Sequence, residues 1–99
     1  MNRAVANQEI SIEMVYERHS DGRYHVTSED VPGFQMVGMD IDAIQNDLDE
    51  VIKDLLRYNS GFVVEQLRWV PSLEDIKHHL QKPNPEGKAR YVASGTIAA

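Results

Sequence analysis

The sequence predicts one α+β domain, in which a three- to four-stranded, mostly antiparallel sheet packs on one long helix. Two observations support this fold class. Several short segments before residue 40 alternate apolar and polar side chains, which is typical of half-buried strands. The segment 41–58 has apolar residues at helical spacing along its whole length. The predicted order is β-β-β-α-β, followed by a short second helix and a tail.

Length and composition limit what the chain can do. It has 99 residues, of which 41% are hydrophobic, so it can build one modest core. Asp and Glu number 16 and Lys and Arg number 10, which gives a formal net charge of -6. Binding to a nucleic-acid duplex requires basic side chains that displace phosphate counterions, so this balance argues against direct nucleic-acid binding. A basic protein partner fits the charge better.

The chain has no cysteine, which excludes disulfides, Cys-bearing zinc sites and thiol catalysis. No segment approaches the run of about 18 apolar residues that a membrane span requires. The first residues, MNRAVANQ, lack the apolar core of a signal peptide, so a cytoplasmic protein without membrane contact is the expectation. Residues 1–8 carry no periodic pattern and are predicted to form a flexible leader.

The first predicted strand begins near Glu9. Its apolar face carries Ile10, Ile12, Met14 and Tyr16. The Asp21–Gly22 pair in the polar segment that follows predicts a hairpin, because glycine tolerates positive φ. RYHVTS is the second predicted strand, with Tyr24 and Val26 facing the core.

The third predicted strand is FQMVGM, with Phe34 and Met36 on one face. Pro32 and Gly33 precede it and predict a tight reversal, since proline fixes φ and glycine adopts conformations denied to other residues. Gly38 is expected to let the chain turn sharply into the helix. The connections are too short for crossovers, so the three strands should form an antiparallel meander.

The long helix is predicted over residues 41–58. Its apolar stripe consists of Ile41, Ile44, Leu48, Val51, Ile52, Leu55 and Tyr58. Asp40 is expected to cap its first turn, where the helix dipole also favours the acidic Asp42. Gly61 can provide a left-handed cap at the other end.

After the helix, FVVEQLRWV (62–70) predicts a fourth strand, expected beside the first strand. PSLEDIKHHLQ predicts a shorter helix capped by Ser72. KPNPEGK is rich in turn residues, and the tail shows strand character only around Tyr91 and Val92, so a strand and a loose tail both fit. The predicted organisation is a leader at 1–8, an α+β domain at 9–70, and an appendage of helix and tail at 71–99.

The segment 22–56, GRYHVTSEDVPGFQMVGMDIDAIQNDLDEVIKDLL, resembles the HicB-like antitoxin family. That family shows an acidic Pro-Gly turn after a strand, then a short strand, a glycine, a capping residue and an amphipathic helix. Here Asp30, Pro32 and Gly33 match the turn and Gly38 matches the glycine, while Asp40 stands where the family usually has a threonine. The resemblance implies a partial ribonuclease H-like fold.

The resemblance also implies a function. HicB-like antitoxins neutralise a small basic toxin-type ribonuclease by protein contact, which fits the charge of this chain. The expected role is therefore a non-enzymatic binding module with a small basic protein as partner. The expected partner-binding residues are Glu29, Asp30, Pro32, Gly33, Gly38 and Asp40. Family members often carry a C-terminal DNA-binding segment, but the part after Pro71 is too short for one.

Two other functions fit the sequence. The sheet face opposite the helix, expected to carry Val15, Val37 and Trp69, needs cover, which a homo-oligomer would supply. A metal-dependent nuclease would need carboxylates that converge on magnesium, for which Glu13 and Glu65 are the candidates.

The histidines and serines do not indicate a catalytic or metal site. His78 and His79 are adjacent, so on a helix they point about 100° apart and share a metal poorly. Glu74–His78 has the i,i+4 spacing of a surface pair. Ser28 and Ser60 lack a neighbouring histidine with an orienting group. We expect no catalytic residue, metal or cofactor.

Overall fold

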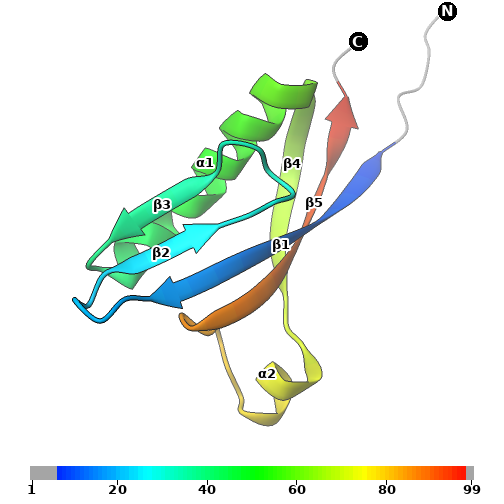
Figure 1. Cartoon of the computed structure of the whole chain (residues 1–99). Coiled ribbons are helices and arrows are strands. Elements are labelled where there is room, and N and C mark those ends of the chain that lie inside the picture. Colours follow the sequence, from blue (N-terminus) through cyan, green and yellow to red (C-terminus); the bar gives the residue numbers. More distant parts are fainter. Residues whose placement is uncertain (1–6, 98–99) are drawn as a thin grey trace, which may run out of the picture.

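The computed structural model describes residues 7–97. Along the chain lie β1 (Gln8–Arg18), β2 (Tyr24–Thr27), β3 (Gln35–Gly38), α1 (Ile41–Ser60), β4 (Phe62–Val70), α2 (Leu73–Lys77) and β5 (Gly87–Ile97). The strands form one antiparallel sheet in the order β3-β2-β1-β5-β4, and α1 packs on one of its faces (Figure 1). The α+β class is thus confirmed. Most of the predicted leader lies outside the described residues, and Gln8 already belongs to β1.

The C-terminal strand β5 is the main departure from the prediction. It lies between β1 and β4 and pairs with both, so β4 does not lie beside β1 as expected. The sheet has five strands, and the tail is an interior strand between β1 and β4 instead of an appendage. The prediction failed because Ala89, Ala93 and Gly95, which face the core, are small residues with weak strand propensity.

Gly95 explains why small residues occupy β5. A Cβ atom at this position would lie 1.9 Å from the carbonyl oxygen of Val63 on β4. β4 contains a bulge between Val64 and Gln66, which brings its backbone close to β5 at this point. The close approach of the two strands therefore requires glycine.

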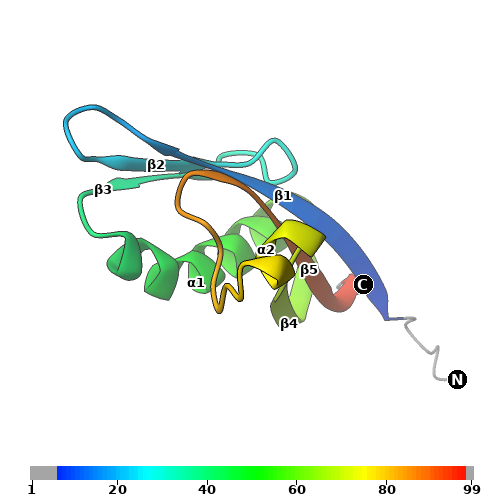
Figure 2. The same cartoon turned by 90° about the horizontal axis from the view of Figure 1, so that it is seen from below.

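The core lies between α1 and the concave face of the curled sheet (Figure 2). On β1, Ile12, Met14 and Tyr16 are buried, as their alternation predicts. The buried residues of α1 are Ile44, Leu48, Ile52 and Leu56. Tyr58 was predicted in this stripe, but its side chain is 88% exposed. Position 58 is rotated by about 200° from Leu56 on the helix, so it faces solvent.

Both predicted caps of α1 are confirmed. The Asp40 side chain accepts hydrogen bonds from the backbone N–H groups of Asp42 and Ala43. Gly61 is left-handed, with φ of 68°, and its N–H donates to carbonyls of the last helical turn. The helix ends at Ser60, two residues beyond the predicted end.

The two predicted turns are also present. In the hairpin, Gly22 has φ of 92°, and Asp21 accepts from the backbone N–H and the Nε of Arg23, which lower the pKa of Asp21. In the second turn the Phe34 N–H donates to the Val31 carbonyl, and Gly33 has φ of 85°. Gly38 differs from the prediction. It ends β3 without a positive φ, so the entry into α1 does not depend on glycine freedom there.

A polar cluster joins β1, β5 and α1 inside the core. The Tyr16 hydroxyl donates to Gln45 Oε1 and lies 3.1 Å from the Tyr91 hydroxyl, which in turn accepts from Gln45 Nε2 at 3.1 Å. Burial, followed by the hydrogen bond to Tyr91, raises the pKa of Tyr16 far above its ordinary value. The cluster satisfies the buried hydroxyl groups and fixes the position of α1 on the sheet.

Residues 71–86 form an arm that projects from the sheet (Figure 1). Its helix α2 is shorter than predicted, but Ser72 caps it through a capping box with Asp75. Leu73 and Ile76 are exposed, and the expected Glu74–His78 pair is present at 3.3 Å. Lys82 returns to the start of α1, where its Nζ lies 3.0 Å from Asp42.

Candidate binding face

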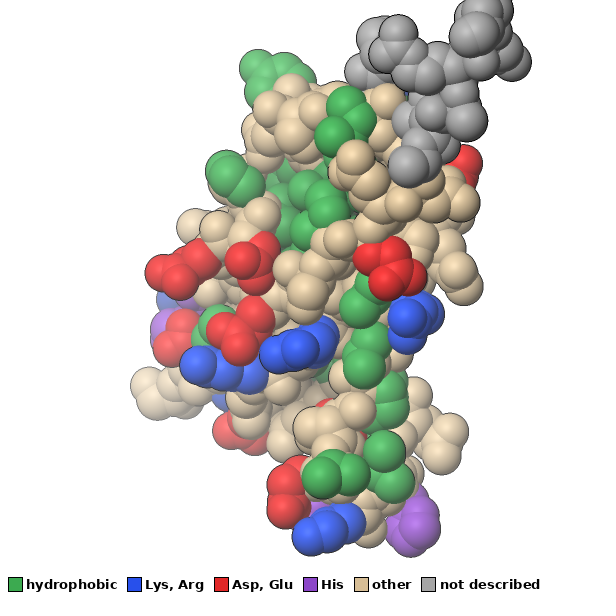
Figure 3. All heavy atoms as spheres, turned by 90° about the vertical axis from the view of Figure 1, so that its right-hand side faces the viewer, with side chains coloured by type: hydrophobic (Ala, Val, Ile, Leu, Met, Phe, Trp, Pro, Cys, Tyr) green, Lys and Arg blue, Asp and Glu red, His purple; other side chains and the backbone are tan. Residues whose placement is uncertain are grey.

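We call the sheet face that α1 does not cover the outer face. Successive residues of a strand point to opposite faces of the sheet. The residues that alternate with the buried ones therefore lie on the outer face. On this face Val15 of β1 lies opposite Lys88 of β5. Two further rows cross all three strands β1, β5 and β4: Glu13, Arg90 and Val70, and Ser11, Val92 and Arg68. Acidic and basic side chains are interspersed on the side of the molecule shown in Figure 3. The outer face therefore carries mixed charge around a few apolar residues.

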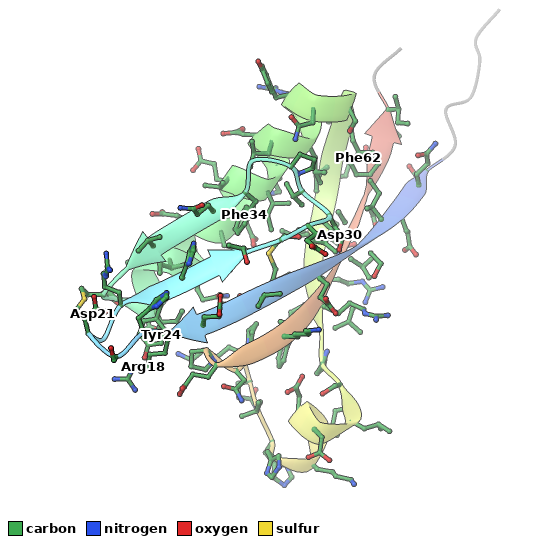
Figure 4. The ribbon with its side chains drawn as sticks, in the orientation of Figure 1. Arg18, Asp21, Tyr24, Asp30, Phe34 and Phe62 are labelled. Atoms are coloured by element: carbon green, nitrogen blue, oxygen red, sulfur yellow. The ribbon has the colours of Figure 1, made fainter. Side chains whose placement is uncertain are left out.

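The loop after β2 is tied to β1 by two side chains. β2 pairs with β1 only from Val15 onward, so the backbone of Glu13 has no strand partner on that side. The Ser28 hydroxyl donates to the Glu13 carbonyl at 2.8 Å, and Asp30 Oδ2 accepts from the Glu13 N–H at 2.7 Å. These bonds take the place of the missing ladder hydrogen bonds and hold the loop that contains Asp30 against β1 (Figure 4).

Two shallow grooves meet on the outer face at Glu13 and Lys88, whose charged atoms lie 3.9 Å apart. The first groove, of about 320 Å³, is lined by Glu13, Val70, Pro71, Ser72, Asp75, Lys88, Ala89 and Arg90. The second, of about 420 Å³, is lined by Glu13, Val15, Thr27, Ser28, Glu29, Asp30 and Lys88. We call the two together the Glu13 trough. It runs from the acidic loop across the sheet to the base of the arm.

The Glu13 trough carries charged side chains of both signs. Glu13, Glu29 and Asp30 bring three carboxylates to one end, whereas Lys88 and Arg90 lie on β5 beside them. All five side chains belong to exposed residues, so solvent screens their charges. A surface of this kind can attract and orient a charged molecule.

The structure divides the predicted partner-binding residues among separate places. Glu29 and Asp30 line the Glu13 trough. Pro32 and Gly33 form the turn above the end of α1, where Asn59 Nδ2 donates to the Pro32 carbonyl at 2.9 Å. Gly38 pairs with Tyr24, at the start of β2, whereas Gln35 pairs with Thr27, at its end. Gly38 and Asp40 therefore lie at the opposite end of β2 from the turn. The six residues therefore do not form one continuous surface.

Lys88, Arg90 and Asp75 were not expected in the site. Their positions depend on the pairing of β5 with β1 and on the return of the arm, which no local pattern indicates. Glu13 appeared only as a nuclease candidate, because its neighbours in space come from distant parts of the sequence. A firm assignment of the tail as a strand, with Tyr91 facing the core, would have placed Lys88 and Arg90 on the outer face.

The nuclease candidates Glu13 and Glu65 lie apart. β5 separates their strands, and Glu13 is in register with Val70, five residues from Glu65 along β4. Two strand spacings and five residues correspond to roughly 10 Å and roughly 16 Å. Within residues 7–97, no three His, Asp or Glu side chains are grouped so that they could hold a metal ion.

No helix among the described residues is long and apolar enough to cross a membrane. Comparisons of the chain with protein-family models, with curated proteins and with solved structures found no significant match. The HicB-like resemblance of residues 22–56 therefore stays a prediction from the sequence.

Proposed function

We propose that this protein is a non-enzymatic, cytoplasmic binding module that neutralises a small basic ribonuclease of the toxin type. The Glu13 trough is the proposed contact. The observation that carries the proposal is the gathering of the Glu13, Glu29 and Asp30 carboxylates at one end of the sheet face that α1 does not cover. The net charge of -6 adds long-range attraction for a basic partner.

The mixed charge of the trough supports selective binding. Lysine and arginine side chains of the partner would pair with the carboxylates of the acidic loop. Lys88 and Arg90, on β5, would repel a basic side chain placed there and attract an acidic one. A partner with a basic patch next to an acidic residue therefore fits in one orientation only.

The test is a titration of the full chain with the product of the neighbouring gene, followed by calorimetry and by an RNA-cleavage assay; the proposal expects that product to be a small basic ribonuclease. The double variant Glu13→Gln, Glu29→Gln should weaken binding about tenfold or more and restore RNA cleavage by the ribonuclease. The matched control is Glu50→Gln with Asp54→Asn, which removes the same charge from the exposed side of α1. Absence of binding, or equal loss in both double variants, would contradict the proposal.

A second candidate is a stand-alone structural or regulatory homo-oligomer without a toxin partner. Exposure of Val63 and Ile97 near the β4 edge of the sheet favours it. The mass of the purified chain in solution, measured without any partner, distinguishes this candidate. The metal-dependent nuclease remains the least supported alternative, because Glu13 and Glu65 do not converge. Magnesium-dependent RNA cleavage that is lost in Glu13→Ala would revive it.

A further inference from the structure

The hairpin between β1 and β2 brings two histidines together. His19 follows the end of β1, and His25 lies on β2. Their ring centroids are 5.7 Å apart, and the two ring planes are inclined by 32°. Two imidazoles that bind one metal ion through nitrogens at about 2.1 Å hold their centroids roughly 5 to 6 Å apart. The observed spacing therefore fits coordination of one ion by both rings.

One ring nitrogen of His25 lacks a partner. His25 alternates on β2 with the buried Val26, so its side chain lies on the outer face of the sheet. Its Nε2 atom is shielded from solvent and has no hydrogen-bond partner among residues 7–97. Buried polar atoms are usually satisfied, and the neutral imidazole nitrogen is the commonest metal ligand in proteins. A metal ion shared with His19 would supply the missing partner.

A carboxylate on β1 lies within reach of the two rings. Glu17 pairs with His25 in the register of β1 and β2, and residues directly opposite each other share one face of the sheet. The Glu17 carboxylate does not stand beside both rings in the structure, because no three possible metal ligands are grouped within residues 7–97. Glu17 is exposed and forms no ion pair within these residues, so its side chain can rotate toward the rings without losing a charged contact.

The backbone of the hairpin is held in shape without these three side chains. The N–H of His19 donates to the Arg23 carbonyl at 2.8 Å, and the N–H of Gly22 donates to the His19 carbonyl at 2.9 Å. The guanidinium of Arg23 is paired with Asp21, which lies at the tip of the hairpin (Figure 4), at 2.8 Å. A metal ion bound by the two rings therefore meets an ordered turn in which the arginine charge is already compensated.

We propose that Glu17, His19 and His25 bind one Zn²⁺ ion through two imidazole nitrogens and one carboxylate. Zinc accepts this combination of ligands, at distances of about 2.0–2.2 Å. Three protein ligands leave the fourth tetrahedral position to a water molecule or to a group of another bound molecule. The ion ties the end of β1 to β2, so its binding stabilises the folded chain.

The zinc site does not depend on the toxin partner. Glu17, His19 and His25 do not line the Glu13 trough. Zinc and a protein partner can therefore be bound at the same time, and a failure of either proposal leaves the other intact.

The test is a calorimetric titration of the full chain with ZnCl₂, after treatment with EDTA and without an affinity tag. The wild type should bind one Zn²⁺ per chain. His19→Ala and His25→Ala should each weaken binding about tenfold or more, and Glu17→Gln should weaken it as well, because a neutral amide oxygen is a poorer ligand. The matched control replaces the other two of the four histidines, His78 and His79 in the arm, by alanine and should leave zinc binding unchanged.

Two further measurements locate the ion. Zinc should shift the imidazole NMR signals of His19 and His25, and it should raise the thermal unfolding temperature of the wild type but not of His19→Ala. Circular dichroism without metal checks that each variant keeps the fold. A wild type that binds no zinc up to about 1 mM, or equal binding by the wild type and the His19→Ala and His25→Ala variants, would overturn the proposal. Unchanged binding by Glu17→Gln would overturn the role of the carboxylate as third ligand.

Discussion

Asp30 Oδ2 accepts the backbone N–H of Glu13 at a distance of 2.7 Å, across 17 residues of sequence. One side chain of the acidic loop thus serves the fold, while its neighbour Glu29 has no comparable bond in the described structure and faces solvent. The resemblance to the HicB-like family assigned both residues to partner binding. The structure separates their roles, which can be measured separately.

Asp30→Ala should lower the free energy of unfolding by about 1 kcal/mol, because the Glu13 N–H then loses its acceptor and the loop loses its attachment to β1. Asp30→Asn should cost less, since its side-chain oxygen can still accept. Glu29→Ala is the matched control and should change stability by less than about 0.5 kcal/mol. Urea unfolding followed by circular dichroism measures all three; equal losses for Asp30→Ala and Glu29→Ala would contradict this account.

Gly95→Ala should destabilise the protein by about 2 kcal/mol or more, because its Cβ would meet the Val63 carbonyl oxygen at 1.9 Å and force β4 away from β5. Gly38→Ala provides the comparison. Its Cβ would lie 3.5 Å from Ile44 Cδ1, which is an ordinary contact, so stability should change little. Thermal unfolding of the two variants distinguishes them, and a Gly95→Ala protein as stable as Gly38→Ala would show that the strands lie farther apart.

Asp40→Ala should cost about 1 kcal/mol, because the first turn of α1 loses the acceptor for the Asp42 and Ala43 N–H groups. Asp40→Ser keeps a capping oxygen and removes the charge, so most of the stability should remain. The same pair tests the predicted role in partner binding. If Asp40→Ser keeps the fold but weakens binding to the basic ribonuclease, the carboxylate contacts the partner.

Stability should fall at alkaline pH through Tyr16. Its folded pKa is raised above the ordinary value of 10.0, so the native state keeps the proton when the unfolded chain has lost it. The contribution of Tyr16 is therefore complete below about pH 10 and decreases as pH rises above that value. Urea unfolding between about pH 8 and pH 11 measures the slope.

Tyr16→Phe should have lower stability at neutral pH, since Gln45 loses a partner, but a flatter decline above about pH 10. Tyr58→Phe is the control, because Tyr58 is exposed and should not alter the slope. An unchanged slope in Tyr16→Phe would assign the alkaline loss to other groups.

Local patterns were sufficient for the elements that repeat a simple period. The apolar alternation of β1 and the stripe and caps of α1 could be predicted, because each depends on residues close in sequence. β5 depends on partners far away, and its small core-facing residues give a weak signal on their own. The prediction of the Glu13 trough from the sequence was limited in the same way. Glu29 and Asp30 could be proposed from the turn, whereas Lys88 and Arg90 could be placed only once β5 was known to pair with β1.

The position of β5 has a consequence for synthesis. β1, β2 and β3 form one ladder and β4 stands apart from them, because only β5 joins β1 to β4. During translation, α1 and β4 are synthesised before β5, so the sheet stays incomplete until residue 97 has left the ribosome. A nascent chain that stops short of β5 would leave apolar side chains of β1, α1 and β4 exposed. Such a chain is a substrate for chaperones and proteases.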